Sequence, residues 1–291
     1  MTPGNQVGIP LFSALEGLLT GNLNLIKLPH GDRGLTLAAL KLLTQREPRL
    51  APWLYAFEVS SKDTGTLERL AALADGAVTW GGDEAVSALR RLAPPGCKLI
   101  EWGHRLSFAY VAGYEDREAE WSALARHIVR TGGLLCSSCQ VIYLDTDRPE
   151  EAEAFCQAFL PLLNRAARER DRDGAAQAAL YTHTYRLERL AEGAGDRTWF
   201  GEGCSLTLKP DRELELSPLY GNVLVKCLPR RELIPVLRRQ KGRLQTAGLL
   251  CRPEEREELT ARKTLYQNSG KVSASLEQAR LCLEGGEEGG G

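Results

Sequence analysis

The chain has 291 residues, a formal net charge of −1, 43% hydrophobic residues and 26% charged residues. A charge so close to zero gives no reason to expect nucleic acid or an anionic membrane surface as a partner. No apolar run approaches the roughly 20 residues of a membrane-spanning helix, and no signal-peptide pattern follows Met1, so the sequence predicts a cytoplasmic protein. Its 8 cysteines are scattered and do not form the disulfide framework of a small secreted domain.

Helix-like and strand-like segments alternate over the first hundred residues. In chain order, the predicted segments are a helix that ends at Gly21, a strand at 23–28, a helix at 35–43, a strand at 53–59, a helix at 67–74, a strand at 77–80, a helix through Val86 and Leu89, and a strand at 98–102. This alternation predicts a parallel sheet covered on both faces, with ligands beyond the carboxyl ends of its strands. Lys27, Gly81-Gly82 and Glu101 fall at or near predicted strand ends, which indicates a nucleotide-type site.

A second α/β domain is predicted from residue 105 onward. Its predicted strands are 107–111, 140–144, 205–208 and 223–227, and its predicted helices are 115–130, 150–170 and 231–239. From residue 263 the chain lacks an apolar period and ends in glycine and glutamate, which predicts a disordered tail. The expected domains are therefore 1–104, a partial dinucleotide-binding domain, 105–262, a catalytic domain that carries the nucleophile, and 263–291, the tail.

Cys136 follows the pair Gly132-Gly133 and precedes an apolar strand. A cysteine in such a place can be held out of the packed interior, where its thiolate can attack a carbonyl and its own amide can bind the developing oxyanion. A buried structural cysteine is the alternative. Cys136 and Cys139 also form a CxxC pattern, but no histidine has ligand-like spacing and a strand follows, so neither a metal nor dithiol chemistry is expected.

Three segments in this order resemble the aldehyde dehydrogenase superfamily, and within it the bacterial luminescence-type fatty acyl-CoA reductases. They are Gly21-Asn22 with Lys27, Leu99-Ile100-Glu101-Trp102-Gly103, and the segment around Cys136. The resemblance runs from about residue 4 to residue 250. It implies an aldehyde dehydrogenase-like α/β fold, with a Rossmann-like cofactor-binding domain and an α/β catalytic domain.

The resemblance also implies catalytic roles. Cys136 would be the nucleophile and Glu101 the general base, which takes a proton from the thiol. The side-chain amide of Asn5 would complete the oxyanion hole. Without the resemblance, Glu101 reads as a salt-bridged or capping glutamate and Asn5 as a cap residue before a helix.

For the cofactor, the resemblance implies that Lys27 contacts the adenosine ribose or its 2′-phosphate. NAD-preferring relatives often have a glutamate where this chain has His30, and Arg33 lies nearby, which favours NADPH. Gly81 and Gly82 match the segment that lets the backbone approach a pyrophosphate at a helix N-terminus. In the second domain, Glu215 matches the glutamate that binds the nicotinamide ribose.

The function implied is reduction of a long-chain fatty acyl-CoA, or of an acyl group brought by a partner enzyme, to the aldehyde. Relatives of this kind are expected to be oligomers. Oxidation of an aldehyde with NAD(P) is one alternative. The other is a non-catalytic remnant that binds a partner, which a large exposed apolar patch beside the first helix would favour. The resemblance further implies a long stretch before Asn5 and more strand and helix after residue 262, so we expect a truncated gene product with a shifted reading frame near its end.

Overall fold

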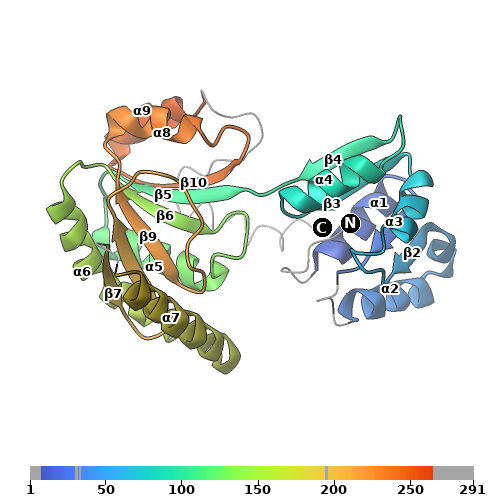
Figure 1. The fold of residues 1–291 in the computed structure, drawn as a ribbon, viewed down its shortest axis with the longest axis horizontal. Helices are drawn as coiled ribbons and strands as arrows, with labels where there is room; N and C mark the ends of the chain where they lie inside the picture. Colours follow the sequence, from blue (N-terminus) through green and yellow to red (C-terminus); the bar gives the residue numbers. More distant parts are fainter. Residues whose placement is uncertain (1–7, 30–31, 33, 194–195, 265–291) are drawn as a thin grey trace. The chain divides into compact units, whose positions relative to one another are not determined.

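A computed structural model describes residues 8–29, 32, 34–193 and 196–264 of the chain. The chain divides into two compact units, residues 1–104 and residues 105–291 (Figure 1). No helix among the described residues is long and apolar enough to cross a membrane.

Helices and strands alternate along the first unit as the sequence predicts. The elements are α1 (Ile9–Leu19), β1 (Asn24–Lys27), α2 (Leu35–Arg46), the 3₁₀ helix η2 (Pro48–Trp53), β2 (Leu54–Phe57), α3 (Thr64–Ala72), β3 (Gly76–Trp80), α4 (Asp83–Leu92) and β4 (Lys98–Trp102). β1 pairs with β2 and β3 with β4, both in parallel. The described strands of this unit form two two-stranded sheets, whereas the alternation predicted one.

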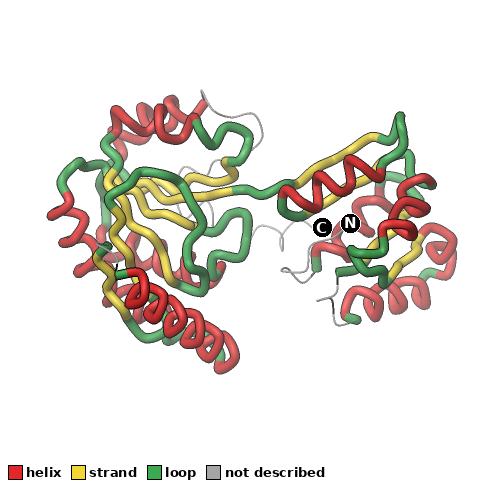
Figure 2. Tube along the Cα trace, viewed as in Figure 1, coloured by secondary structure: helices red, strands yellow, loops and turns green. Residues whose placement is uncertain are grey.

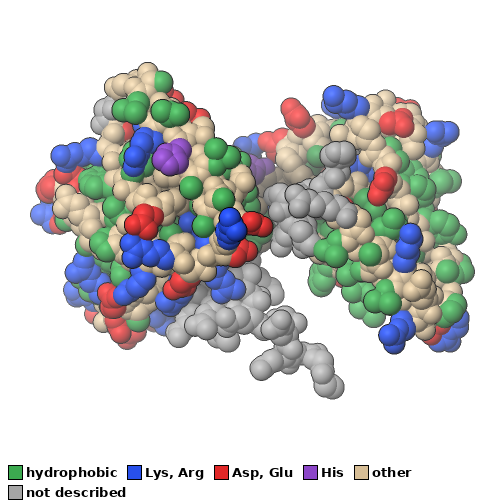
Figure 3. Space-filling model, turned by 90° about the horizontal axis from the view of Figure 1, so that it is seen from below, with side chains coloured by type: hydrophobic (Ala, Val, Ile, Leu, Met, Phe, Trp, Pro, Cys, Tyr) green, Lys and Arg blue, Asp and Glu red, His purple; other side chains and the backbone are tan. Residues whose placement is uncertain are grey.

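A small apolar core holds α1, β1 and α2 together. Its buried members are Ala14, Ile26, Leu28 and Leu40. On the other side of α1, Phe12, Leu15 and Leu19 are exposed, and their spacing of three and four residues places them on one face. Figure 3 shows hydrophobic side chains over much of the visible surface of this unit. Apolar residues exposed together on one helix face can mark a contact with another protein surface, so this face of α1 is a candidate contact surface.

The second unit is built on a six-stranded sheet with the order β10-β5-β6-β9-β8-β7. Its strands are β5 (Leu106–Val111), β6 (Cys139–Leu144), β7 (Arg197–Phe200), β8 (Ser205–Lys209), β9 (Asn222–Cys227) and β10 (Leu244–Leu250). Its helices are α5 (Arg117–Thr131), α6 (Pro149–Ala167), α7 (Arg172–Glu192), the 3₁₀ helix η3 (Arg230–Glu232), α8 (Leu233–Arg238) and α9 (Pro253–Thr264). All neighbouring strands are parallel except β7 and β8.

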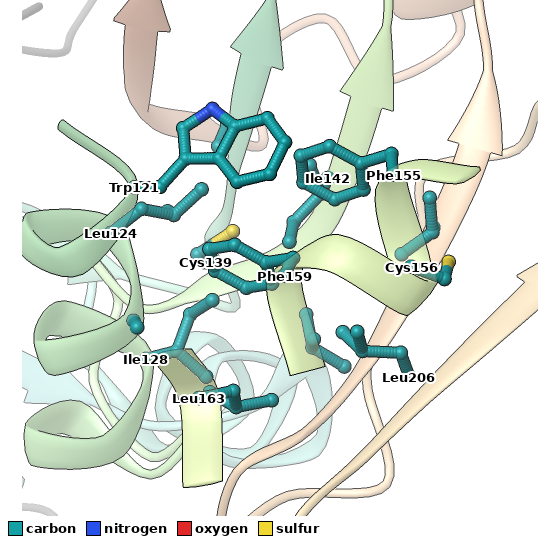
Figure 4. Packing of buried hydrophobic residues seen from close by; sticks show 14 of the residues in the cluster. Trp121, Leu124, Ile128, Cys139, Ile142, Phe155, Cys156, Phe159, Leu163 and Leu206 are labelled. Atoms are coloured by element: carbon teal, nitrogen blue, oxygen red, sulfur yellow. The ribbon is translucent and has the colours of Figure 1, made fainter. Parts of the chain in front are cut away.

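Helices cover both faces of this sheet (Figures 1 and 2). On one face, α5 and α6 bury an apolar cluster against β6 and β8. In this cluster the ring of Trp121 meets Phe155 edge-on at 4.8 Å, and Phe155 stacks on Phe159 at 5.1 Å (Figure 4). On the other face, leucines of α8 and Leu259 of α9 pack against β5, β6, β9 and β10.

Helix α7 was not predicted, because two of its three buried residues, Thr182 and Tyr185, are polar and the third, Ala178, is small. Tyr185 shares a hydrogen bond of 2.9 Å with Thr207 of β8, and Thr182 donates to Asn222 of β9 at 3.0 Å. Leu180 and Leu187 instead point to solvent. The apolar pattern of α7 therefore does not mark the side that packs on the sheet.

Strands β7 and β10 and helix α9 were also missed. β10 has a mixed sequence, LQTAGLL, with neither alternation nor a long apolar run. α9 ends at Thr264, two residues beyond the predicted domain end. Of the predicted tail, residues 265–291 lie outside the described residues.

Phe159 tests the packing of α6. We expect Phe159→Ala to lower the free energy of unfolding by about 3–5 kcal/mol, because it removes a fully buried ring from between two aromatic neighbours. Urea titration followed by circular dichroism measures the change. Leu187→Ala on the exposed face of α7 is the control and should change the free energy by less than about 0.5 kcal/mol. Equal losses in the two variants would contradict this account of the core.

Candidate active site

Cys136 lies on the turn that joins α5 to β6, and its side chain is exposed. The Gly132-Gly133 pair that precedes the turn is required by geometry. Both residues have φ in the left-handed region, at 57° and 78°. A Cβ atom on Gly133 would come within 2.9 Å of a Leu219 methyl group and 3.1 Å of the Ser217 hydroxyl. Glycine therefore lets the chain end α5 and turn closely past a neighbouring loop before it presents the cysteine.

Three hydrogen bonds hold the carbonyl groups of the turn around Cys136. The Ser138 amide donates to the Leu135 carbonyl at 3.0 Å, and the Ser107 hydroxyl donates to the Cys136 carbonyl at 2.6 Å. Nε2 of His127 lies 3.1 Å from the Ser137 carbonyl oxygen. In contrast, the amide N–H groups of Cys136 and Ser137 donate to no other group of the described residues. Neighbouring groups therefore hold the carbonyl groups of the turn, and the amide N–H groups of Cys136 and Ser137 stay available within the described part of the chain.

His127 is a neutral member of this arrangement. Burial lowers the pKa of His127, and the effect of Arg130 adds to it, against the opposing effect of the Ser137 hydrogen bond. Because a carbonyl oxygen only accepts, Nε2 must carry the proton. The contact of His127 with the Ser137 carbonyl was not predicted, because the spacing of histidines and cysteines in the sequence bears on metal sites and not on hydrogen bonds to the backbone. No group of His, Cys, Asp or Glu side chains that could hold a metal occurs among the described residues.

Gln140 ties the turn to the loop before β9. Its Nε2 donates to the Gly133 carbonyl at 2.9 Å. Its Oε1 accepts from the amide and the hydroxyl of Ser217, at 3.0 and 2.7 Å. Farther along this loop, the Tyr220 amide donates to the Gly132 carbonyl at 2.7 Å. Tyr220 has a φ of 49°, a strained value for a residue with a side chain, which such contacts help to hold.

Cys139 differs from Cys136 in its exposure. It is buried in the core under α5 and α6, and burial raises its pKa to about 12. A thiol with this pKa stays protonated at neutral pH and is a poor nucleophile. Of the CxxC pair, Cys136 is the residue whose thiol can meet a substrate.

Glu101 lies on β4 and forms a two-pronged ion pair with Arg90 of α4. Nε of Arg90 donates to one carboxylate oxygen at 2.5 Å, and Nη2 donates to the other at 2.6 Å. These hydrogen bonds hold the pKa of Glu101 below its usual range. A salt-bridged glutamate was the alternative to a general base in the prediction for Glu101, and the structure contains that salt bridge. Released from Arg90, the carboxylate would be a stronger base.

Gly81 and Gly82 lie between β3 and α4, at the carboxyl end of β3. A Cβ atom on Gly81 would come within 2.9 Å of the Ala85 methyl group, whereas the space beside Gly82 is open. The backbone here is accessible to a ligand. However, the first turn of α4 carries Asp83 and Glu84, whose carboxylates already complement the helix dipole and repel phosphate.

Lys27 is the last residue of β1, and partial burial lowers its pKa. It therefore stands at the carboxyl end of a parallel strand, as the sequence predicted. The other residues assigned to this region from the resemblance, Asn5, His30 and Arg33, lie outside the described residues. Their roles stay predictions.

Glu215 belongs to an ion cluster around a buried lysine. The Lys226 ammonium is fully buried and donates to Asp211 and Glu215, each at 2.5 Å, and to the Glu213 carbonyl at 2.7 Å. Lys209 donates to the same oxygen of Glu215 at 2.9 Å. Partial burial raises the pKa of Glu215, but the hydrogen bonds from the two lysines lower it more. The cluster fastens the segment that leads to Ser217, two residues from Glu215.

A surface hollow of about 840 Å³ runs along α5 and reaches the turn at Leu135. Its wall on α5 carries Glu118, Arg126, His127 and Arg130. Leu135, Leu249 and Leu250 also line it, so its wall is both charged and apolar.

Comparison with known proteins gives two matches in sequence. The model of the acyl-CoA reductase (LuxC) family matches residues 1–267. The long-chain acyl-protein thioester reductase of Aliivibrio fischeri is 25% identical over 193 residues, which are 65% of this chain and 39% of that protein. The chain thus spans about two fifths of the length of this curated relative.

Solved structures of aldehyde dehydrogenases share the fold. A lactaldehyde dehydrogenase superposes with a TM-score of 0.64 at 16% identity, over 93% of this chain and 60% of its own. The Δ¹-pyrroline-5-carboxylate dehydrogenase of Mycobacterium tuberculosis superposes with a TM-score of 0.63 at 17% identity, over 94% of this chain and 55% of its own. The aldehyde dehydrogenase-like α/β fold predicted from the sequence is confirmed.

The ion cluster makes stability depend on pH. The pKa of Glu215 in the folded chain is below its ordinary value of 4.5, so its contribution is present above that pH and is lost as the pH falls through the folded value. We expect Glu215→Gln to lower the free energy of unfolding by about 1 kcal/mol or more at pH 7, and by less at pH 3, in urea titrations. Glu213→Gln, whose carboxylate forms an exposed ion pair with Arg239, is the control and should have little effect at either pH. A pH-independent loss in Glu215→Gln would contradict the cluster's role.

Proposed function

Because this chain belongs to the acyl-CoA reductase (LuxC) family, we propose that it reduces long-chain fatty acyl-CoA to the fatty aldehyde through an acyl-cysteine at Cys136. NADPH is the proposed hydride donor. The observation that carries the proposal is the exposed Cys136 thiol on a turn with held carbonyl groups and two available amides. The name of the Aliivibrio fischeri relative supports a thioester as the substrate. A cytoplasmic location, predicted from the sequence, stays a prediction.

In the first step, Sγ of Cys136 attacks the carbonyl carbon of the acyl thioester. A bond forms between Sγ and this carbon, the carbon–sulfur bond to CoA breaks, and CoA leaves as a thiolate. The charge that develops on the carbonyl oxygen is stabilised by the Cys136 amide, which the structure leaves available. The side chain of Asn5, outside the described residues, is the proposed second donor. One donor of this kind contributes roughly 3–4 kcal/mol to transition-state stabilisation.

A nicotinamide dinucleotide fits the first unit at its glycine turn. The open space beside Gly82 admits a ligand close to the backbone, and Lys27 is the proposed contact for the ribose or its 2′-phosphate. Asp83 and Glu84 disfavour phosphate directly at the end of α4, so the pyrophosphate is expected beside the glycines. When bound, the cofactor supplies the hydride that reduces the acyl group. His30 and Arg33 are the proposed basis of the preference for NADPH, and Glu215 is the proposed contact to the nicotinamide ribose.

Glu101 is the proposed acceptor of the Cys136 thiol proton. A reductase has to protect its thioester from water, and a strong base beside it would activate water for hydrolysis. The ion pair with Arg90 keeps Glu101 ionised and weakens it as a base. As a weak base, Glu101 is suited to accept a proton from a thiol, which is more acidic than water, rather than from a water molecule.

A second candidate function rests on the exposed face of α1. Phe12 and Leu19 lie on α1 itself and are 61% and 87% exposed. A large exposed apolar patch beside the first helix was the feature expected to favour a partner-binding role. Such a surface suits contact with an acyl-transferring enzyme or with further copies of the chain, both of which are proposals. The alternative of aldehyde oxidation has no comparable observation in its favour.

Labelling of Cys136 tests the proposed function. We expect the chain to gain the mass of one acyl group on incubation with a long-chain acyl-CoA, and to release it as the aldehyde when NADPH is added. Cys136→Ala should gain no acyl group, because the nucleophile is absent, whereas the half-buried Cys97→Ala should behave as the wild type. Intact-protein mass spectrometry measures the adduct. Acylation of Cys136→Ala would overturn the assignment of the nucleophile, and a wild-type chain that stays unmodified would favour the partner-binding role.

Arg90 provides a test of the base. Arg90→Gln removes the hydrogen bonds that hold down the pKa of Glu101, so this pKa should rise toward its ordinary value of 4.5. Glu101 is an acceptor only when ionised, so the acid limb of the acylation rate should move to higher pH. Stopped-flow acylation rates across the pH range measure the shift. Arg91→Gln, an exposed neighbour on α4, is the matched control, and identical profiles for Arg90→Gln and the wild type would speak against Glu101 as the proton acceptor.

A further inference from the structure

Both ladders of β5 lose their register at the level of Ser107. On one side, Ser107 pairs with Cys139 but Phe108 pairs with Val141, so β6 carries one extra residue, Gln140. On the other side, Leu106 pairs with Leu244 and Phe108 with Ala247, so β10 has two intervening residues where β5 has only Ser107. Bulges of this kind release backbone groups from the ladder and redirect neighbouring side chains, and they recur next to active sites.

The hydroxyl of Ser107 occupies the gap that these irregularities leave. It accepts a hydrogen bond from the Thr246 amide of β10 at 2.9 Å and donates to the Cys136 carbonyl at 2.6 Å. Ser107 is itself 1% exposed, so neither bond competes with water. The buried side chain of Ser107 thus holds the backbone carbonyl of Cys136, the proposed nucleophile, by a hydrogen bond.

The hydrogen bond from Ser107 to the Cys136 carbonyl also fixes the direction of the Ser137 amide, which belongs to the same peptide group. In a trans peptide, the Ser137 N–H points opposite to the Cys136 carbonyl, and the structure has no cis peptide bond among its described residues. Because the carbonyl faces the buried Ser107, the Ser137 N–H faces away from Ser107. By the same geometry, the bond from the Ser138 amide to the Leu135 carbonyl orients the Cys136 N–H.

We propose that Ser107 is a positioning residue for acyl transfer, which holds the Cys136–Ser137 peptide so that the Ser137 amide serves beside the Cys136 amide as a donor to the oxyanion. This inference deepens the proposed function and rests on Cys136 as the nucleophile. Two successive N–H groups on one turn form a concave anion site. Such a pair places two oxyanion donors on one turn, in addition to the side-chain donor proposed above.

The test separates oxyanion chemistry from access to the thiol. Acylation by p-nitrophenyl hexanoate, which forms the Sγ–carbon bond and releases p-nitrophenolate, passes through an oxyanion. Alkylation by iodoacetamide displaces iodide and forms no oxyanion. The rates of both reactions at Cys136 are measured on the full chain, by the p-nitrophenolate burst and by peptide mass spectrometry, with decanoyl-CoA as a second acyl donor.

Ser107→Ala should acylate about ten- to a hundredfold more slowly, because the donor is displaced rather than deleted, while its alkylation rate stays within about twofold. Ser107→Thr, which keeps the hydroxyl, should recover most of the acylation rate. Thr207→Val is the matched control, since it removes another buried hydroxyl with two hydrogen bonds from the same sheet, on β8, and it should change neither rate.

Two results would overturn the inference. One is an acylation rate in Ser107→Ala equal to that of the wild type. The other is a parallel fall of acylation and alkylation, which would assign Ser107 a role in the general order of the turn. A wild-type chain that is alkylated at Cys136 but accepts no acyl group from either donor would overturn the proposed function itself, and the inference with it.

Discussion

The hydroxyl of Ser107 joins the sheet of the second unit to the turn of Cys136, and much of the site depends on this one buried contact. Parallel ladders on both sides of β5 are interrupted at Ser107, and its side chain satisfies backbone groups that the ladders leave. An unsatisfied buried amide or carbonyl costs roughly 1–3 kcal/mol. The same contact therefore relieves an irregular sheet and fixes the direction of the backbone at Cys136.

The turn is also fixed from the side. His127 of α5 meets the Ser137 carbonyl, and Gln140 bridges the Gly133 carbonyl and Ser217. Behind Ser217, the ion cluster around Lys226 anchors the loop. Catalysis by preorganised donors needs such support, because a donor that must be reoriented during the reaction loses much of its effect. A rigid backbone and an exposed thiol are thus compatible within one short turn.

The two glutamates that the resemblance singled out, Glu101 and Glu215, differ in their charged neighbours. Glu101 meets one arginine at the surface of the first unit, and the ion pair makes it a weak base that is always ionised at neutral pH. Glu215 forms ion pairs with Lys209 and with the fully buried Lys226, and its carboxylate helps to neutralise the buried charge of Lys226. A buried ammonium without a partner would be strongly destabilising. Any contact of Glu215 with a ligand has to share the carboxylate with Lys226.

The order of elements in the first unit and the strands around Cys136 could be read from the sequence, because apolar periodicity and glycine positions are local properties of the chain. The aldehyde dehydrogenase-like fold was implied by the resemblance of the motifs. Helix α7 could not be read from the sequence, since its buried residues are Ala178, Thr182 and Tyr185, of which two are polar, and several of its leucines are exposed. The glycines before Cys136 and the strand after it left a buried structural cysteine as the alternative, and Cys136 was singled out as the nucleophile, which stays a proposal, only together with the resemblance. What only the tertiary structure decided is the set of partners: Arg90 for Glu101, two lysines for Glu215, and Ser107 for the Cys136 carbonyl. Each of these contacts joins separate elements and leaves no periodic trace in the sequence, because the distance between two side chains depends on how helices and strands pack.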